Sequence, residues 1–110
     1  MRQTNFTLQE IEQFLNGAKP CSFPRCLLLN ELGEMAKVGD EGAEKALHPF
    51  LLDAVEENER VVAYCCLGAL PNPNAETVKV LRTFADNPGN APIVGWAFEQ
   101  YEITPPAIAA

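Results

Sequence analysis

Four cysteines and one histidine are the side chains in this 110-residue sequence best suited to bind a metal or to act as nucleophile and base. Cys65 and Cys66 are adjacent, so on a helix their side chains point about 100° apart and cannot hold one ion together in the usual way. Cys21 and Cys26 are also not spaced like the two-residue gap of a zinc knuckle. We therefore expect no metal site, no cofactor and buried, reduced cysteines, while the reactivity of each thiol stays open.

His48 is the only imidazole that could serve as a catalytic base, and the following Pro49 favours a residue near a helix start instead. The adjacent carboxylates Glu56 and Glu57 could form an acid/base pair, but a polar helix end favours solvated caps. The sequence contains no Gly-rich phosphate loop. These observations predict that the protein is not an enzyme.

The charge pattern argues against two classes of partner. The formal net charge is −7, and the eight basic residues are scattered along the chain rather than gathered on one segment. A nucleic-acid-binding domain concentrates Lys and Arg, and an anionic membrane also attracts basic clusters. We therefore expect neither nucleic acid nor membrane as a partner. The first residues lack the apolar core of a signal peptide, which makes the cytoplasm the expected location.

Apolar residues recur at helical spacing in six segments, and no segment shows convincing two-residue alternation, which predicts an all-α domain. A capping box from Thr7 to Glu10 starts the first helix, which stops at Gly17. Ser22 is the expected N-cap of the second helix, with Pro24 in its first turn.

The remaining four helices are expected at 43–57, 59–70, from the N-cap Asn74 to the turn at 87–90, and 91–101. Pro49 lies inside the first of these, so that helix either starts near His48 or bends at the proline. Leu47, Phe50 and Leu51 form its expected buried stripe.

The helices repeat in pairs. A shift of 35 positions places Arg25 on Arg60, Leu32 on Leu67, Gly33 on Gly68 and Met35 on Leu70. A shift of 36 places Ile11, Phe14 and Leu15 on Leu47, Phe50 and Leu51. A weaker shift of 32 places Tyr64 on Trp96, as expected of a terminal capping unit. We predict one domain, 1–103, with units at about 7–38, 43–71 and 74–102, and a Pro-rich tail at 104–110.

The segment 60–75 resembles the HEAT repeat, and most closely the short HEAT-like form of bilin lyases (the PBS-lyase type, armadillo-like) and of bacterial scaffold proteins. In that family a helix carries an Arg near its start and a Leu-Gly near its end, here Arg60 and Leu67-Gly68, before a Pro-bearing turn. The apolar residue usual before the Arg is Glu59 here and Pro24 in the first unit. The resemblance implies a right-handed α-solenoid of three antiparallel helix pairs.

The resemblance also implies that the second helix of each pair lines a concave face that binds a partner. Two alternatives stay open: Tyr64 and Trp96 belong to the core if the helix phase differs by one residue, and Arg25 and Arg60 pair with acidic residues of a neighbouring turn. The expected concave-face residues are Arg25, Cys26, Leu29, Arg60, Val61, Tyr64, Ile93 and Trp96.

These features predict a non-catalytic protein–protein interaction module or adaptor that presents its concave face to a protein or peptide. The alternative is an enzyme or enzyme subunit of the HEAT-like lyase type that acts on a small ligand through a Cys or Asp on that face. Likeness to HEAT-like DNA-repair glycosylases conflicts with the acidic charge. Self-association through exposed ends or through the Pro-Pro-Ala-Ile tail is a third hypothesis.

Overall fold

The computed structural model describes residues 6–18, 24–53 and 56–102, and in these ranges the chain forms six α-helices, one short 3-10 helix and no strand. The predicted all-α class is confirmed. Ser22, Cys21 and the tail at 104–110 lie outside the described residues. The elements are α1 (Leu8–Leu15), α2 (Arg25–Lys37), α3 (Glu41–Leu52), α4 (Glu57–Gly68), α5 (Ala75–Asp86), η1 (Pro88–Asn90) and α6 (Ala91–Tyr101).

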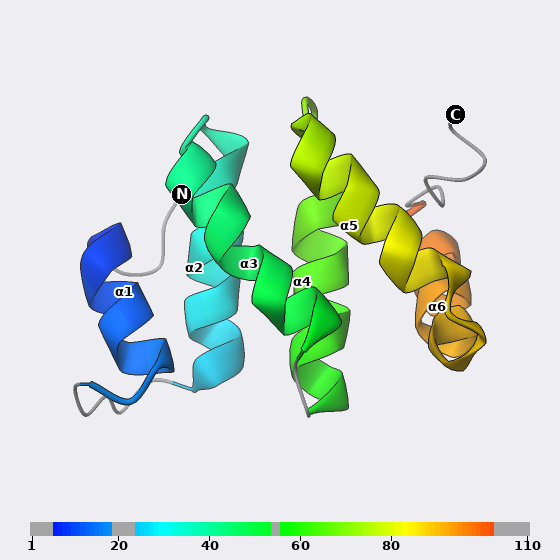
Figure 1. The fold of residues 1–110 in the computed structure, drawn as a ribbon, viewed down its shortest axis with the longest axis horizontal. Helices are drawn as coiled ribbons and strands as arrows, with labels where there is room; N and C mark the ends of the chain where they lie inside the picture. The colour runs from blue at the N-terminus through cyan, green and yellow to red at the C-terminus, as the bar shows by residue number, and fades with distance from the viewer. Residues whose placement is uncertain (1–5, 19–23, 54–55, 103–110) are drawn as a thin grey trace.

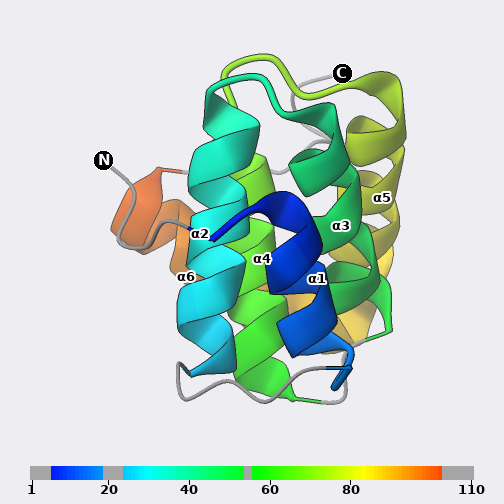
Figure 2. The ribbon, with the colours of Figure 1, turned by 90° about the vertical axis from the view of Figure 1, so that its left-hand side faces the viewer.

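The helices form two layers. Figure 2 shows α1, α3 and α5 in one layer and α2, α4 and α6 in the other. The pairs follow one another along the longest axis of the molecule, from α1 at one end to α6 at the other (Figure 1). Helix α2 packs against α3 and α4, α3 also packs against α5, and α6 packs against α4. Helix α4 therefore lies between other helices of the layer, whereas α6 is the last described helix of that layer.

Side-chain caps fix three of the helix starts. The Thr7 hydroxyl accepts from the Glu10 amide at 3.2 Å and the Glu10 carboxylate accepts from the Thr7 amide at 3.0 Å, which confirms the capping box. Asn74 caps α5 as predicted, through a 2.8 Å bond from the Thr77 amide. Asp40 caps α3 by accepting from the Ala43 amide. Each cap satisfies an amide that has no partner within its helix.

The predicted boundaries of three helices, α2, α3 and α4, are wrong by a few residues. Pro24 is the N-cap residue of α2 rather than part of its first turn. Helix α3 starts at Glu41, because Asp40 caps it earlier than the glycine-rich turn suggested, and it ends at Leu52 rather than at residue 57. Pro49 lies inside α3 on an exposed position, so the bond that its missing amide would have made is lost on the solvent side of the helix. Helix α4 starts and ends two residues before the predicted range.

The residues paired by the repeat shifts have similar burial in the two units. Leu32 and Leu67 are both fully buried, Met35 and Leu70 are both almost fully buried, and Phe14 and Phe50 are both half-buried. Gly33 permits close packing of α2 on α4, because a Cβ at this position would lie 2.6 Å from the Cys66 sulfur. The buried apolar residues form one core: Ile11, Leu15, Leu28, Leu29, Leu32, Met35, Ala36, Ala43, Leu47, Leu51, Ala63, Tyr64, Leu67, Leu70, Val80, Leu81, Phe84, Ile93 and Ala97.

Candidate interaction surface

An apolar hollow lies between the first turns of α4 and α6. Its volume is about 370 Å³, and we call it the groove. Three of the predicted concave-face residues line it together: Val61 from α4, and Ile93 and Trp96 from α6. The other lining residues are Glu57, Asn58 and Pro92. Val61 of the second predicted unit and Ile93 and Trp96 of the third therefore meet at one place.

Helical spacing and an aromatic contact position the α6 wall of the groove. Ile93 and Trp96 are three residues apart, so both side chains lie on the same side of α6. Ile93 is mostly buried, while Trp96 is 42% exposed. The Trp96 ring contacts the Tyr101 ring edge to face, with centroids 5.4 Å apart. Trp96 thus presents a large apolar ring to solvent at the rim of the groove.

Two predicted surface residues belong to the core instead. Tyr64 and Leu29 have no exposed side-chain surface. Tyr64 stacks on Phe84 of α5 with centroids 5.1 Å apart, and burial raises the pKa of its hydroxyl. The interpretation of Tyr64 and Leu29 as groove residues is therefore wrong, and the core alternative holds for Tyr64. It does not hold for Trp96.

Arg25 lies away from the groove and connects three elements. Its Nε donates to a Glu59 carboxylate oxygen at 3.0 Å, and its guanidinium also donates to the Leu15 carbonyl at 2.8 Å. It further lies over the Phe50 ring at 5.8 Å. The alternative of a pair that locks neighbouring units together therefore describes Arg25. Arg60 is half-buried and does not line the groove.

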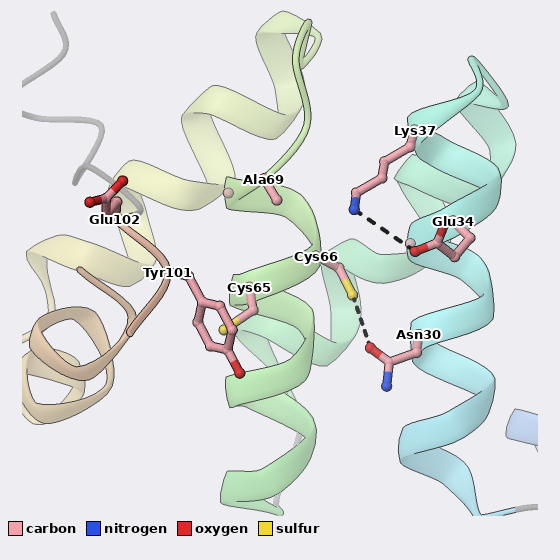
Figure 3. A pocket seen from close by; sticks show the side chains of 10 residues that line it. Asn30, Glu34, Lys37, Cys65, Cys66, Ala69, Tyr101 and Glu102 are labelled. Carbon is pink, nitrogen blue, oxygen red and sulfur yellow. Dashed lines mark hydrogen bonds and ion pairs between the residues drawn. The ribbon is translucent and has the colours of Figure 1, made fainter. Parts of the chain in front are cut away.

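A larger, polar hollow of about 700 Å³ lies at the other end of α4, and we call it the cleft. Figure 3 shows Cys65 beside Tyr101, Cys66 directed toward Asn30, and Lys37 directed toward Glu34. The residues that line the cleft come from α2, α4 and the end of α6: Asn30, Gly33, Glu34, Lys37, Cys65, Cys66, Gly68, Ala69, Tyr101 and Glu102.

The thiols in the cleft are poor nucleophiles. Burial raises the pKa of the Cys66 thiol to about 12, and burial also raises the pKa of Cys65. Both side chains are therefore protonated thiols at neutral pH, whereas the thiolate is the reactive form. Cys26 is half-buried and free, and Cys21 lies outside the described residues.

A buried polar network joins α3 to the start of α5. The Thr77 hydroxyl donates to the Glu44 carboxylate, which also accepts from the Asn74 amide at 2.9 Å. His48 Nε2 lies 2.8 Å from the Thr77 oxygen. Because the single hydroxyl proton goes to Glu44, His48 must donate to Thr77 and cannot act as the base that activates it.

Sequence reasoning missed Glu44 and Thr77. The signal available was the position of Glu44 and His48 on the buried side of α3, where two polar residues interrupt an apolar stripe with Leu47 and Leu51. Buried polar residues at such positions require partners. The identity of the partner was beyond the sequence, because Thr77 lies 33 residues away from Glu44.

Within the described residues, no group of three or more His, Cys, Asp or Glu side chains could hold a metal ion. None of the described helices is long and apolar enough to cross a membrane. No protein-family model, curated protein or solved structure matches the chain.

Proposed function

We propose that the protein is a non-catalytic protein-interaction module, built as a short right-handed HEAT-like array, that binds a partner through the α2–α4–α6 layer. The observation that carries this proposal is the groove at Val61, Ile93 and Trp96. Large exposed aromatic residues beside an apolar hollow are typical of the central contacts of protein interfaces.

The packing supports the repeat part of the proposal. The first turn of α2 contacts the first turn of α4 through Arg25 and Glu59, and the first turn of α6 contacts that of α4 at the groove. The last turns of α4 and α6 meet at the cleft. The three helices of this layer therefore run in the same direction, as stacked helix pairs require.

The chemistry of the polar residues favours binding over the lyase-type alternative. The described thiols in the cleft are held protonated by burial. His48 is engaged as a donor to a hydroxyl that itself donates to Glu44. Neither arrangement supplies an activated nucleophile. The acidic net charge of −7 also disfavours self-association through like surfaces.

The proposal is tested by selecting short random peptides on the immobilised protein and measuring their affinity for folded variants. We expect Trp96→Ala and Val61→Glu to weaken the selected peptides about tenfold or more. The matched control is Phe98→Ala, because Phe98 is 53% exposed on the same helix and does not line the groove. Equal binding by Trp96→Ala and the parent protein, or no selected peptide at all, would contradict the proposal.

A further inference from the structure

The groove and the cleft lie one after the other along the same side of α4. Val61 lines the groove and Cys65 lines the cleft, and residues four apart lie on one side of a helix. On α6, Trp96 lines the groove and Tyr101 lines the cleft, and their rings are in contact. The aromatic pair therefore stands between two neighbouring hollows.

The separation of the hollows suits a short peptide segment. From Val61 to Gly68 the axis of α4 advances about 10 Å, because each helical residue rises about 1.5 Å. An extended peptide advances about 3.3 Å per residue, so roughly three residues cover this distance. One bound segment can thus place one side chain in each hollow.

The cleft has the electrostatic character of a cation site. The last residues of α4 and α6 line it, and the carboxyl end of a helix carries partial negative charge. Glu102 adds a carboxylate that forms no ion pair within the described residues, while Lys37 is paired with Glu34 at 3.8 Å. The Tyr101 ring is 60% exposed and offers an aromatic face to a cation. A lysine or arginine side chain meets the helix ends, the Glu102 carboxylate and the Tyr101 ring favourably, while the Lys37 ammonium is directed toward Glu34.

The groove has the opposite character. Its walls are the apolar side chains of Val61, Pro92, Ile93 and Trp96, with Glu57 as its single charged lining residue. A branched aliphatic side chain fills such a hollow without leaving a polar group unpaired. A carboxylate at the rim again favours a basic neighbour in the partner over an acidic one.

We propose that the partner is a basic peptide segment with a large aliphatic side chain in the groove and, about three residues along, an arginine or lysine in the cleft. This inference rests on the proposed function and specifies the chemistry of its partner. The net charge of −7 supports the same choice, since it attracts basic segments over acidic ones.

To test this inference, the peptides selected on the immobilised protein are sequenced. The affinity of one of them is then measured by fluorescence anisotropy. We expect enrichment of an aliphatic residue two to four positions from Arg or Lys. Replacing that basic residue by Glu should weaken binding to the parent protein about three- to tenfold. Glu102→Lys should weaken the basic peptide similarly and improve the binding of its Glu version.

The matched control is Glu99→Lys, which makes the same charge change on an exposed α6 residue outside both hollows. We expect it to change affinity by less than about twofold. Circular dichroism confirms that each variant is folded.

Two outcomes separate this inference from the proposed function. In the first outcome, the selected peptides require Trp96 but are not enriched in basic residues, and Glu102→Lys affects their binding no more than Glu99→Lys does. This outcome would overturn the inference and leave the proposed function standing. Peptides whose binding is unaffected by Trp96→Ala would overturn both.

Discussion

Helices α4 and α6 lie in the same layer, yet Tyr64 of α4 is buried in the core and Trp96 of α6 is exposed. Helix α4 packs against α2, α3, α5 and α6, and its Tyr64 is fully buried. Helix α6 packs against α4 at the end of the layer (Figure 1). Its Trp96, Phe98 and Tyr101 are exposed. The difference in burial between the two aromatic residues follows from the position of each helix in the layer rather than from its amino-acid composition.

This comparison shows what is unusual about α6. The terminal unit of a helical array ordinarily has a polar outer face, because no neighbour covers it. Eight of the eleven residues of α6 are Ala, Pro, Ile, Val, Gly, Trp or Phe. Within the described residues, α6 is therefore an apolar helix that keeps aromatic side chains exposed, which is the feature that the proposed binding surface would use.

The largest expected effect comes from truncating the two aromatic residues that the 32-residue shift pairs, Tyr64 in the core and Trp96 on the surface. Tyr64→Ala should lower the free energy of unfolding by about 3–5 kcal/mol, because it leaves a cavity in the core. Trp96→Ala should cost less than about 1 kcal/mol, because half-exposed residues lose few contacts. Chemical denaturation monitored by circular dichroism measures both.

A conservative substitution sharpens the Tyr64 result. The Tyr64 hydroxyl is buried and has no hydrogen-bond partner in the described part of the chain. Tyr64→Phe should therefore be neutral or stabilising, since it removes an unsatisfied polar group without changing the ring. A strong loss of stability in Tyr64→Phe would contradict this account of the core.

Two helical glycines probe packing tightness in the same two regions. Gly33→Ala should destabilise the protein by about 1–3 kcal/mol, because its new Cβ would lie 2.6 Å from the Cys66 sulfur and push α2 from α4. Gly95→Ala on α6 meets no atom within 4 Å, so its better helix propensity should stabilise the protein by up to about 1 kcal/mol. Equal effects of the two substitutions, measured by denaturation, would refute the contrast.

The smallest effect concerns pH and the interior network. Desolvation lowers the pKa of His48 in the folded protein, opposed by Glu76 and Glu44 and assisted by Lys45. The unfolded chain therefore takes up this proton first as pH falls below about 6.5, so protonation of His48 lowers stability on acidification. Stability should be regained as the pH rises above that value.

His48→Gln is the matched control for the pH effect, because its side-chain amide can still donate to Thr77 but does not titrate. Unfolding curves between pH 7 and 5 should lose less stability in this variant than in the parent protein. If the parent protein loses no more stability than His48→Gln over this pH range, protonation of His48 does not cause the loss.

Most of the secondary structure was predictable because local chemistry sets it. Thr7 and Asn74 cap their helices as expected, and α6 begins and ends at the predicted residues. The phase of α4 was not predictable. Val61 to Leu67 is an unbroken apolar run, so its periodicity does not reveal which side faces the interior. That ambiguity placed Tyr64 on the surface.

The candidate site was predictable only in part, because helical spacing is a local property and the packing of helices distant in sequence is not. Val61, Ile93 and Trp96 meet in one groove, whereas the partner of Arg25 depends on the packing of α2 against Glu59 of α4. The cleft joins the ends of two helices with residues of a third, and a contact between elements far apart in sequence leaves no local pattern. The network of Glu44 and Thr77 was missed on the same ground.

The central claim, that the groove binds the partner, is tested most directly by the environment of Trp96, the single tryptophan of the chain. Acrylamide quenching of its fluorescence should be efficient in the free protein, because the side chain is 42% exposed. We predict that a saturating concentration of a selected peptide lowers the quenching constant. A non-binding peptide at the same concentration should leave the quenching constant unchanged. An unchanged quenching constant at saturation would contradict the groove as the binding surface.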